Sequence, residues 1–344
     1  MNVLIVKLGA IGDVVMASPM VAAARRLDPD ARVTWVCGLA VEPLLRALGT
    51  IDELVAVDEA ALLKGTRAQQ STVLLEAWRH LAGRHFDLIL TGYRDRRYQL
   101  LTVSARGGVR RSFSSGRRPG LVPGRYHGDE YVRLVLGEDG PQAPRLPLPQ
   151  PVFELAPELR RMLGQNGIKT VVLAPGGAKN LLRDDALRRW PLENYVELAS
   201  ELAREGVSIV LAGGPSDDWV RKPFASVPCV DLVGQTDLLQ LAALFQASSL
   251  VITHDSGPMH LAALAGAPLI ALFGPTQPEE KVRESITTRV FWGGAELACR
   301  PCYDGVTYAP CRNNVCIQGV TVSQVREAAH ELLGTAAHSP PPRR

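Results

Sequence analysis

The sequence predicts an α/β protein with two Rossmann-like domains, and three observations lead to this prediction. A continuous apolar run at residues 2–7 is followed by a glycine-containing turn, a helical stretch and a second apolar run at residues 32–37. The same succession of strand, turn, helix and strand recurs at residues 249–273. Such alternation is typical of a parallel sheet covered by helices. Residues 140–151 contain five prolines, which exclude a helix or a central strand there.

These observations divide the chain into an N-terminal domain, an extended proline-rich linker, a C-terminal domain and a disordered tail. The four segments are expected at residues 1–140, 141–152, 153–334 and 335–344, respectively. Further strands are expected at residues 53–57, 86–91, 170–174 and 208–211. Further helices are expected at about residues 71–82, 129–136, 157–166, 193–205 and 238–247. Pro19 falls inside the first helical stretch and should kink it or mark its true start.

The turn after the first strand, at residues 8–13, contains Gly9 and Gly12 but not the G-x-G-x-x-G pattern of dinucleotide-binding domains. The second strand does not end in an acidic residue that would hold a ribose. Both features argue against a nicotinamide-dependent enzyme. Asp13, at the mouth of this turn, has two interpretations: a helix cap, or a general base that takes a proton from a hydroxyl nucleophile.

A basic stretch follows the predicted strand at residues 86–91. Between residues 94 and 125 there are nine arginines and one acid, Asp95. Two interpretations stay open: a surface for an anionic acceptor, which would include a membrane face, or solvated loops with scattered ion pairs. The arginines are at positions 94, 96, 97, 106, 110, 111, 117, 118 and 125.

In the C-terminal half, three predicted strands end in glycine-containing loops at residues 175–178, 212–215 and 255–257. In a parallel sheet these loops share one edge, which is the usual place for a nucleotide, and Lys179, Arg188 and Arg189 are available to a diphosphate.

The third loop lies in the stretch HDSGPMHLAAL, at residues 254–264. Asp255, Ser256 and Gly257 stand where the N-terminus of a helix expected at residues 259–265 would offer N–H groups to an anion. The alternative is that Asp255 or Ser256 only caps this helix and that His260 lies in the core.

Four cysteines form the pattern C-x2-C-x8-C-x4-C: Cys299, Cys302, Cys311 and Cys316. This pattern suggests a structural zinc or iron site, because four thiolates can surround one ion. The alternative is a set of reduced thiols that pack a loop. A catalytic metal is not expected, since no open position or His/Asp partner is nearby in the sequence.

The composition is that of a soluble globular protein, with 46% hydrophobic and 21% charged residues. The net charge of +3 is too small to indicate a nucleic-acid partner. No apolar run approaches the roughly 18–20 residues that span a bilayer, and the chain begins at once with a strand rather than a signal peptide. The protein is therefore expected in the cytoplasm.

Several of these stretches together resemble the lipopolysaccharide heptosyltransferases, the ADP-heptose-dependent members of glycosyltransferase family 9. They are VKLGAIGDVV at 6–15, RWPLENY at 189–195, DSGPMHLAALAGAP at 255–268, FGPT at 273–276 and the cysteine run at 299–316. The resemblance implies a GT-B architecture, in which two Rossmann-like domains face a central cleft. It also implies an inverting, metal-independent transfer of heptose from ADP-heptose to a sugar hydroxyl of an anionic glycolipid, without a cofactor.

The resemblance assigns roles to single residues. Asp13 matches the proposed general base, and Arg188 falls where the family often has a lysine that contacts the donor. Asp217 and Thr236 match positions on the ribose or adenine side. The remaining donor-site matches are the loop glycines and the residues around the diphosphate and heptose: Gly176, Gly177, Asp255, Ser256, Gly257 and His260.

Residues 178–188 form a longer segment than the common family pattern, and the arginine-rich stretch is a feature of this chain. The acceptor is where members differ most. The alternatives are therefore an enzyme of the same fold that acts on a protein or another glycan, and a nucleotide-binding module without catalysis. Peripheral contact with the inner membrane is a further expectation.

Overall fold

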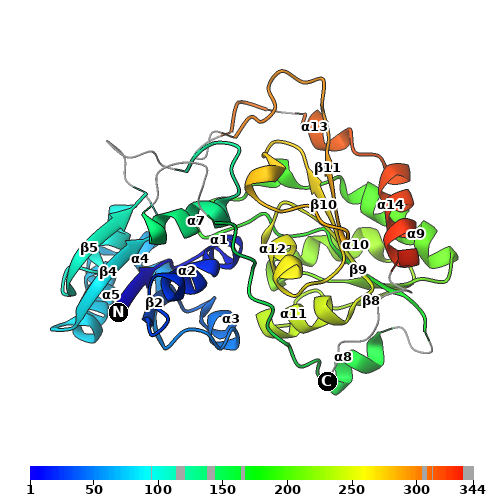
Figure 1. Ribbon diagram of the computed structural model, residues 1–344. Helices are drawn as coiled ribbons and strands as arrows, with labels where there is room; N and C mark the ends of the chain where they lie inside the picture. The colour runs from blue at the N-terminus through cyan, green and yellow to red at the C-terminus, as the bar shows by residue number, and fades with distance from the viewer. Residues whose placement is uncertain are drawn as a thin grey trace. The chain divides into compact units, whose positions relative to one another are not determined.

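The computed structural model describes residues 1–93, 95–113, 121–137, 144–163, 167–303, 308–311 and 313–335. Contacts between residues divide the chain into an N-terminal unit, Met1–Pro151, and a C-terminal unit, Val152–Arg344. Each unit contains a parallel sheet flanked by helices (Figure 1). The prediction of two Rossmann-like α/β domains is therefore confirmed.

The N-terminal unit contains a five-stranded parallel sheet in the order β3-β2-β1-β4-β5. Its strands are β1 (Asn2–Val6), β2 (Arg32–Gly38), β3 (Glu53–Val57), β4 (His85–Thr91) and β5 (Arg106–Ser112). The strand order reverses between β1 and β4, where Val6 and Thr91 are register partners. The carboxyl ends of these two strands therefore form the topological switch point of the sheet, the usual place for a ligand.

Seven helices accompany this sheet in the described part of the N-terminal unit. They are α1 (Ile11–Ala17), α2 (Pro19–Leu27), α3 (Glu42–Ala47), α4 (Glu59–Lys64), α5 (Arg67–Leu81), α6 (Arg96–Leu100) and α7 (His127–Leu136). The expected effect of Pro19 is confirmed: α1 ends at Ala17, and Pro19 opens α2, where a missing N–H costs nothing.

The C-terminal unit contains a six-stranded parallel sheet in the order β11-β10-β9-β6-β7-β8. Its strands are β6 (Thr170–Ala174), β7 (Ser208–Leu211), β8 (Cys229–Asp231), β9 (Leu250–His254), β10 (Leu269–Phe273) and β11 (Thr288–Trp292). Here the order reverses between β6 and β9, where Ala174 pairs with Thr253. The loops that follow β6 and β9 therefore lie at the switch point of this sheet.

The helices of the C-terminal unit include three short 3₁₀ turns, η1 (Ala186–Arg188), η2 (Pro215–Val220) and η3 (Pro278–Glu280). The α-helices are α8 (Pro157–Met162), α9 (Leu192–Arg204), α10 (Arg221–Phe224), α11 (Leu238–Ala247), α12 (Gly257–Leu264), α13 (Val315–Gln318) and α14 (Val322–Thr335). Along the ranges given above, no helix is long and apolar enough to cross a membrane.

The cores of both units are built from the strands with continuous apolar runs. In the N-terminal unit Leu4, Val6 and Val36 are fully buried beneath α4 and α5. In the C-terminal unit Trp190 is almost completely buried, and its indole Nε1 donates to the carbonyl of Val320 at 2.8 Å. That contact ties the segment before α9 to the segment before α14.

The structure corrects several expectations. The arginine-rich stretch is not composed of loops alone, because it contains α6 and the edge strand β5. The helix expected at 157–166 ends at Met162, and residues 164–166 lie outside the described residues. The tail expected at 335–344 also lies outside them, except that Thr335 is the last residue of α14. The proposed linker at 141–152 remains a prediction; its described part, residues 144–152, contains neither helix nor strand.

Candidate active site

Asp13 lies at the switch point of the N-terminal sheet, in the first turn of α1. Its carboxylate is 36% exposed, and its Oδ2 is 2.9 Å from the ammonium Nζ of Lys7. The N-cap residue of α1 is Ala10, and Asp13 is the acidic residue of the first turn, so both interpretations of Asp13 stay open. A half-exposed carboxylate with a fixed cationic neighbour is suited to accept a proton from a bound hydroxyl.

Lys7 follows β1 directly, and its side chain is completely buried. Its Nζ donates to the carbonyl of Gly9 at 2.7 Å and lies 4.8 Å from the centre of the Tyr93 ring. A buried ammonium group is stable only when it is paired in this way. Lys7 therefore fixes the turn at residues 8–13 and the carboxylate of Asp13 at the same time.

Two buried tyrosines lie in the electrostatic field of Asp13. Burial, together with the negative charge of Asp13, raises the pKa of Tyr131 well above its usual range. Burial and the neighbouring Glu59 raise that of Tyr98, whose hydroxyl donates to Glu59 at 2.7 Å. Both phenols are therefore neutral in the physiological range. Asp13, unlike these two tyrosines, is partly exposed to solvent.

In the C-terminal unit, Asp217 joins two of the predicted glycine loops. Its Oδ1 accepts from the backbone N–H of Gly177 and its Oδ2 from that of Gly214, both at 2.9 Å. A Cβ at Gly176 would lie 2.4 Å from the Asp217 carboxyl carbon, and Gly177 has φ +78°. Both positions therefore require glycine. The predicted ribose or adenine contact of Asp217 stays a prediction, beside this observed role in holding the loops.

Asp255 and Arg188 form a buried ion pair at the switch point of this sheet. Asp255 Oδ2 is 3.4 Å from Arg188 Nη1, and it accepts from the hydroxyl of Thr276 at 2.7 Å. Burial opposes the charged form of Asp255, but Arg188, Lys281 and His260 outweigh it and hold the pKa of this carboxyl below its ordinary value. A cation and a carboxylate are thus both charged in a site with little access to water.

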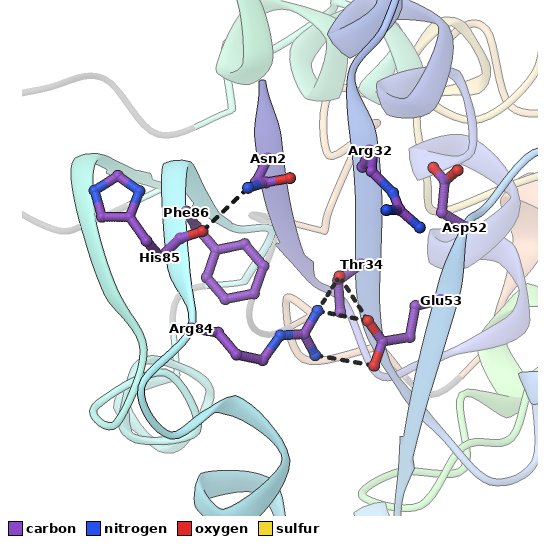
Figure 2. A pocket seen from close by; sticks show the side chains of 8 residues that line it. All are labelled: Asn2, Arg32, Thr34, Asp52, Glu53, Arg84, His85 and Phe86. Carbon is purple, nitrogen blue, oxygen red and sulfur yellow. Dashed lines mark hydrogen bonds and ion pairs between the residues drawn. The ribbon is translucent and has the colours of Figure 1, made fainter.

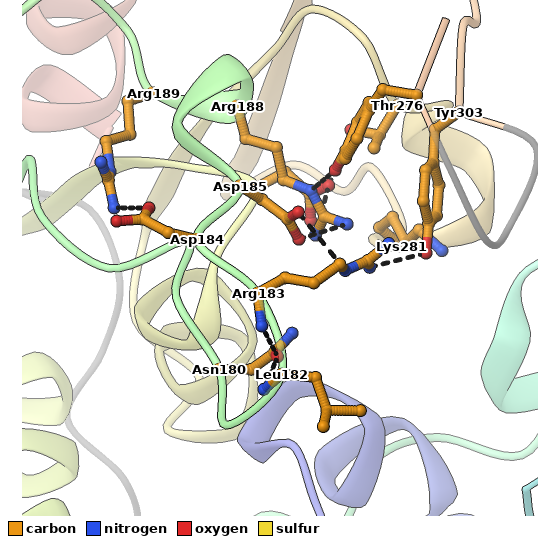
Figure 3. A network of polar contacts seen from close by, with 12 residues as sticks. Asn180, Leu182, Arg183, Asp184, Asp185, Arg188, Arg189, Thr276, Lys281 and Tyr303 are labelled. Atoms are coloured by element: carbon orange, nitrogen blue, oxygen red, sulfur yellow. Dashed lines mark hydrogen bonds and ion pairs between the residues drawn. The ribbon is translucent and has the colours of Figure 1, made fainter. Parts of the chain in front are cut away.

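Figure 3 shows the polar network around Arg188. Besides Asp255, its guanidinium faces Asp185 at 3.5 Å, and its Nε donates to the hydroxyl of Tyr308. Arg183, in the same segment, donates to the hydroxyl of Tyr303 at 2.9 Å. The longer segment at residues 178–188 is therefore not a free loop, because its arginines are attached to a distant part of the chain.

The other predicted donor-site residues surround the N-terminus of α12. Ser256 is the N-cap residue, but its hydroxyl donates to the carbonyl of His254 at 3.1 Å and does not cap the helix. The simple capping interpretation of Ser256 is therefore wrong. Gly257 opens the helix, and His260 is buried one turn later. The N–H groups at this helix start suit an anion.

His254 is buried completely, and its Nδ1 lies 3.2 Å from the Tyr195 hydroxyl. Burial lowers the pKa of His254 to about 3, so the ring is neutral at physiological pH. Its Nε2 and the Oγ1 of Thr236 are the two buried polar side-chain atoms without a hydrogen-bond partner in the described part of the chain. Lys179 is exposed, and its backbone forms an isolated antiparallel β-bridge with Asp184. Arg189 donates to the carbonyl of Gly177 at 2.9 Å.

The cysteine pattern does not form a metal centre in the structure. Among the residues described, no group of three or more cysteine, histidine, aspartate or glutamate side chains is placed to hold a metal ion. Cys299 and Cys311 are exposed, Cys302 is half-buried and Cys316 is buried. Burial raises the thiol pKa of Cys302 and Cys316, and neighbouring cysteines, Cys311 among them, raise it further. On the geometry of the described residues, the predicted zinc or iron site has no support.

The arginine-rich stretch is used largely within the chain itself. Arg97 pairs with Asp95 at 2.6 Å, and Arg125 pairs with the buried Glu130 at 3.0 Å. Arg110 donates to Thr102, and Arg111 donates to the carbonyl of Val135. Arg96 and Arg106 are exposed, whereas the arginines at 94, 117 and 118 lie outside the described residues. Ion pairs within the chain thus explain two of the nine arginines, and hydrogen bonds to neutral groups explain two more.

A cavity of about 290 Å³ lies in the N-terminal unit at the amino ends of the strands (Figure 2). Arg84 crosses it and pairs with Glu53 at 2.5 Å, and it also donates to the hydroxyl of Thr34 at 3.0 Å. Asn2 and His85, which begin β1 and β4, also line it. Because open α/β sheets bind ligands at the opposite edge, this cavity is not the candidate active site.

The residues of these sites that were not predicted from the sequence include Lys7, Tyr303 and Tyr308. Lys7 stands at the end of an apolar strand, and a charge there is a signal that could have been used. The tyrosines carry no such signal, because their contacts with arginines are made between segments 120 residues apart.

The family model described as glycosyltransferase family 9 (heptosyltransferase) matches residues 145–310. Lipopolysaccharide heptosyltransferase 2 of Salmonella typhimurium is 26% identical over 310 residues, which cover 81% of this chain and 84% of that protein. The lipopolysaccharide core heptosyltransferase OpsX of Haemophilus influenzae is 28% identical over 291 residues, covering 80% of this chain and 79% of that protein.

Among solved structures, ADP-heptose lipopolysaccharide heptosyltransferase II of E. coli matches with a TM-score of 0.74 at 20% identity. The match covers 98% of this chain and 100% of that chain. At this identity the likeness shows the fold, and it confirms the predicted GT-B class.

Proposed function

Since the chain belongs to the heptosyltransferase-like glycosyltransferases of family 9, we propose that it transfers heptose from ADP-heptose to a sugar hydroxyl of the lipopolysaccharide core. The similar proteins of Salmonella typhimurium and Haemophilus influenzae are named for heptose transfer to lipopolysaccharide. The donor and the acceptor are both anionic, which agrees with the charged side chains at each switch point.

One observation carries the donor half of this proposal: the charged pair of Arg188 and Asp255 at the carboxyl edge of the C-terminal sheet. The Nη atoms of Arg188 lie 3.4–3.5 Å from their carboxylate partners, longer than a strong charge-assisted hydrogen bond. Its N–H groups can therefore turn to a diphosphate without breaking a short bond.

The proposed reaction is a single displacement that inverts the anomeric carbon. The acceptor oxygen attacks this carbon, and its proton passes to the carboxylate of Asp13. The bond between the anomeric carbon and the β-phosphate oxygen breaks, and its electron pair leaves with ADP. Arg188 and the N-terminus of α12 at Ser256 and Gly257 stabilise the charge that develops on the diphosphate. No metal or cofactor is part of this scheme, and neither is the cysteine pattern.

The acceptor half of the proposal concerns an anionic glycolipid, and with it peripheral contact of the protein with the inner membrane in the cytoplasm. Exposed arginines such as Arg96 and Arg106 would contribute to this contact through their positive charge. Sedimentation with anionic vesicles tests this part. Binding that weakens with added salt supports the proposal, and absence of binding at low salt contradicts it.

The test of the proposed activity has two stages. Calorimetry with ADP, UDP, GDP and NAD should show a preference for ADP. Incubation with ADP-heptose and isolated core lipid should then give a lipid heavier by one heptose. Labelling of a protein instead would favour the alternative acceptor, and ADP binding without donor turnover would leave a nucleotide-binding module.

Asp13→Asn keeps the shape of the side chain and removes the base. We expect this variant to bind ADP normally and to lose transfer by at least about 10²-fold, the usual contribution of a general base. Transfer at a rate near that of the wild type would show that Asp13 is not the base.

A further inference from the structure

Two tyrosines of the cysteine segment, which we define as residues 299–303, 308–311 and 313–316, contact the arginines of the donor side. Tyr303 and Tyr308 pair as an antiparallel bridge, and their ring centroids are 4.7 Å apart. The guanidinium of Arg188 lies 5.3 Å from the centre of the Tyr303 ring and 5.8 Å from that of Tyr308. Arg183 lies over the same two rings at 5.2 and 5.9 Å. The two rings thus form an aromatic surface for two cations.

The hydroxyl of Tyr308 makes the closest contact of Arg188. It accepts from Nε, whereas the Nη atoms keep longer distances of 3.4 and 3.5 Å to Asp255 and Asp185. Burial alone would lower the pKa of Arg188, but Asp255 and Tyr308 raise it above the ordinary value. Tyr308 therefore binds the Nε–H of the guanidinium, and the Nη atoms face the loop that carries Asp255.

The cysteine segment is fixed to the same part of the sheet. The backbone N–H of Cys302 donates to the carbonyl of Pro275 at 3.0 Å, and that of Ala309 donates to the carbonyl of Cys302 at 3.0 Å. Pro275 precedes Thr276, whose hydroxyl donates to Asp255. Pro275 and Thr276, just after β10, therefore contact both the segment that carries the tyrosines and Asp255, the carboxylate partner of Arg188.

We propose that Tyr308 is a positioning residue for the donor: it orients Arg188 toward the diphosphate, and the cysteine segment thereby sets the affinity for ADP. This inference rests on the proposed function, in which Arg188 contacts the donor. The proposed role is orientation, because the phenol hydroxyl accepts a hydrogen bond from Nε of Arg188. The cysteine segment is then a support for the donor site rather than a separate module.

The test compares ADP binding by the full-length wild type and Tyr308→Phe. The variant keeps the ring and removes only the acceptor of Arg188 Nε. We expect the Kd for ADP to rise about fivefold or more, in the range of a lost hydrogen bond to a charged group. The KM for the sugar donor should rise by a similar factor, whereas the KM for the acceptor should not change. Tyr303→Phe is the matched control, since its hydroxyl serves Arg183, and its Kd should stay within about twofold of the wild type.

A double-mutant cycle separates orientation from general damage to the fold. Lysine has no Nε–H edge, so Tyr308→Phe should change the Kd little when it is made in Arg188→Lys. An equal loss in both backgrounds would overturn the inference, as would a Tyr308→Phe variant that binds ADP like the wild type. If the wild type itself binds no ADP, the proposed function fails and this inference fails with it. If the wild type binds ADP and only the Tyr308 comparison fails, the proposed function stands.

Discussion

Substitution of Lys7 tests how the buried ammonium group controls the protonation of the proposed base, Asp13. Lys7→Met keeps the length of a buried side chain and removes the ammonium that lies 2.9 Å from Asp13. Without its cationic partner, the carboxylate of Asp13 binds a proton more readily. The base is then active only at higher pH, so the acid limb of the kcat/KM profile should move upward.

The size of this shift follows from the geometry. At 2.9 Å, two unit charges attract each other by about 6 kcal/mol at an effective dielectric constant of about 20. The carboxylate is 36% exposed, however, and water screens its charge. The roughly 0.2–1 kcal/mol of fully exposed ion pairs is therefore the lower limit of the attraction. We take about 1.4 kcal/mol as the working value, which corresponds to a shift of about one pH unit.

The assay is the dependence of kcat/KM on pH for the wild type and Lys7→Met, with a melting temperature for each protein. Lys64→Met is the matched control, because Lys64 is exposed at the end of α4 and the same atoms are removed. Its profile should match the wild type. An unmoved acid limb in a folded Lys7→Met variant, together with loss of transfer in Asp13→Asn, would refute the reasoning that Lys7 controls the base.

Two further predictions concern the C-terminal unit. The pKa of His254 is about 3 because of burial, against about 6.5 in the unfolded chain. Between these values the unfolded chain binds a proton that the folded chain does not. The free energy of unfolding should therefore fall by about 1.4 kcal/mol for each unit by which the pH is lowered. His254→Gln should lack this slope, and denaturant unfolding at pH 6.5 and 5 would detect a relative change of about 1.7 kcal/mol. Parallel pH dependences would contradict this prediction. Asp217→Ala leaves the amides of Gly177 and Gly214 without their acceptor and should lower the free energy of unfolding by about 2–4 kcal/mol. Asp218→Ala, at a carboxylate that is 73% exposed, should change it by less than about 1 kcal/mol in the same unfolding experiment, and similar losses in both variants would argue against the role of Asp217.

The strands with continuous apolar runs could be predicted from the sequence. β6 and β7 begin and end at the expected residues because each valine- and leucine-rich run starts at a hydroxyl residue, Thr170 or Ser208, and is followed by a glycine two residues after its end. β5 could not be predicted, since its sequence RGGVRRS has no apolar pattern and is mostly exposed. It is defined by pairing instead: a Cβ at Gly107 would lie 2.1 Å from the carbonyl oxygen of Phe86, so only glycine fits beside β4. β8 has only three residues, too few for a pattern.

The place of the candidate site could be predicted better than its contacts. Loops after parallel strands meet at one edge, so the glycine loops and Asp255 could be brought together from strand order alone. The partners of Arg188 could not. Asp185 is three residues away and Tyr308 is 120 residues away, and spacing in the sequence does not distinguish a carboxylate that neutralises an arginine from a phenol that orients it.

The free edge of the N-terminal sheet has a consequence for the behaviour of the protein at high concentration. Within the described residues, β5 is the last strand of its sheet, and one side of its backbone has no neighbouring strand there. Such an edge can pair with a strand of another molecule and start aggregation. Three arginines and two glycines among the seven residues of β5 oppose this, because like charges repel and glycine weakens a strand. Part of the basic stretch thus opposes edge-to-edge association of the protein, independently of any ligand that the protein binds.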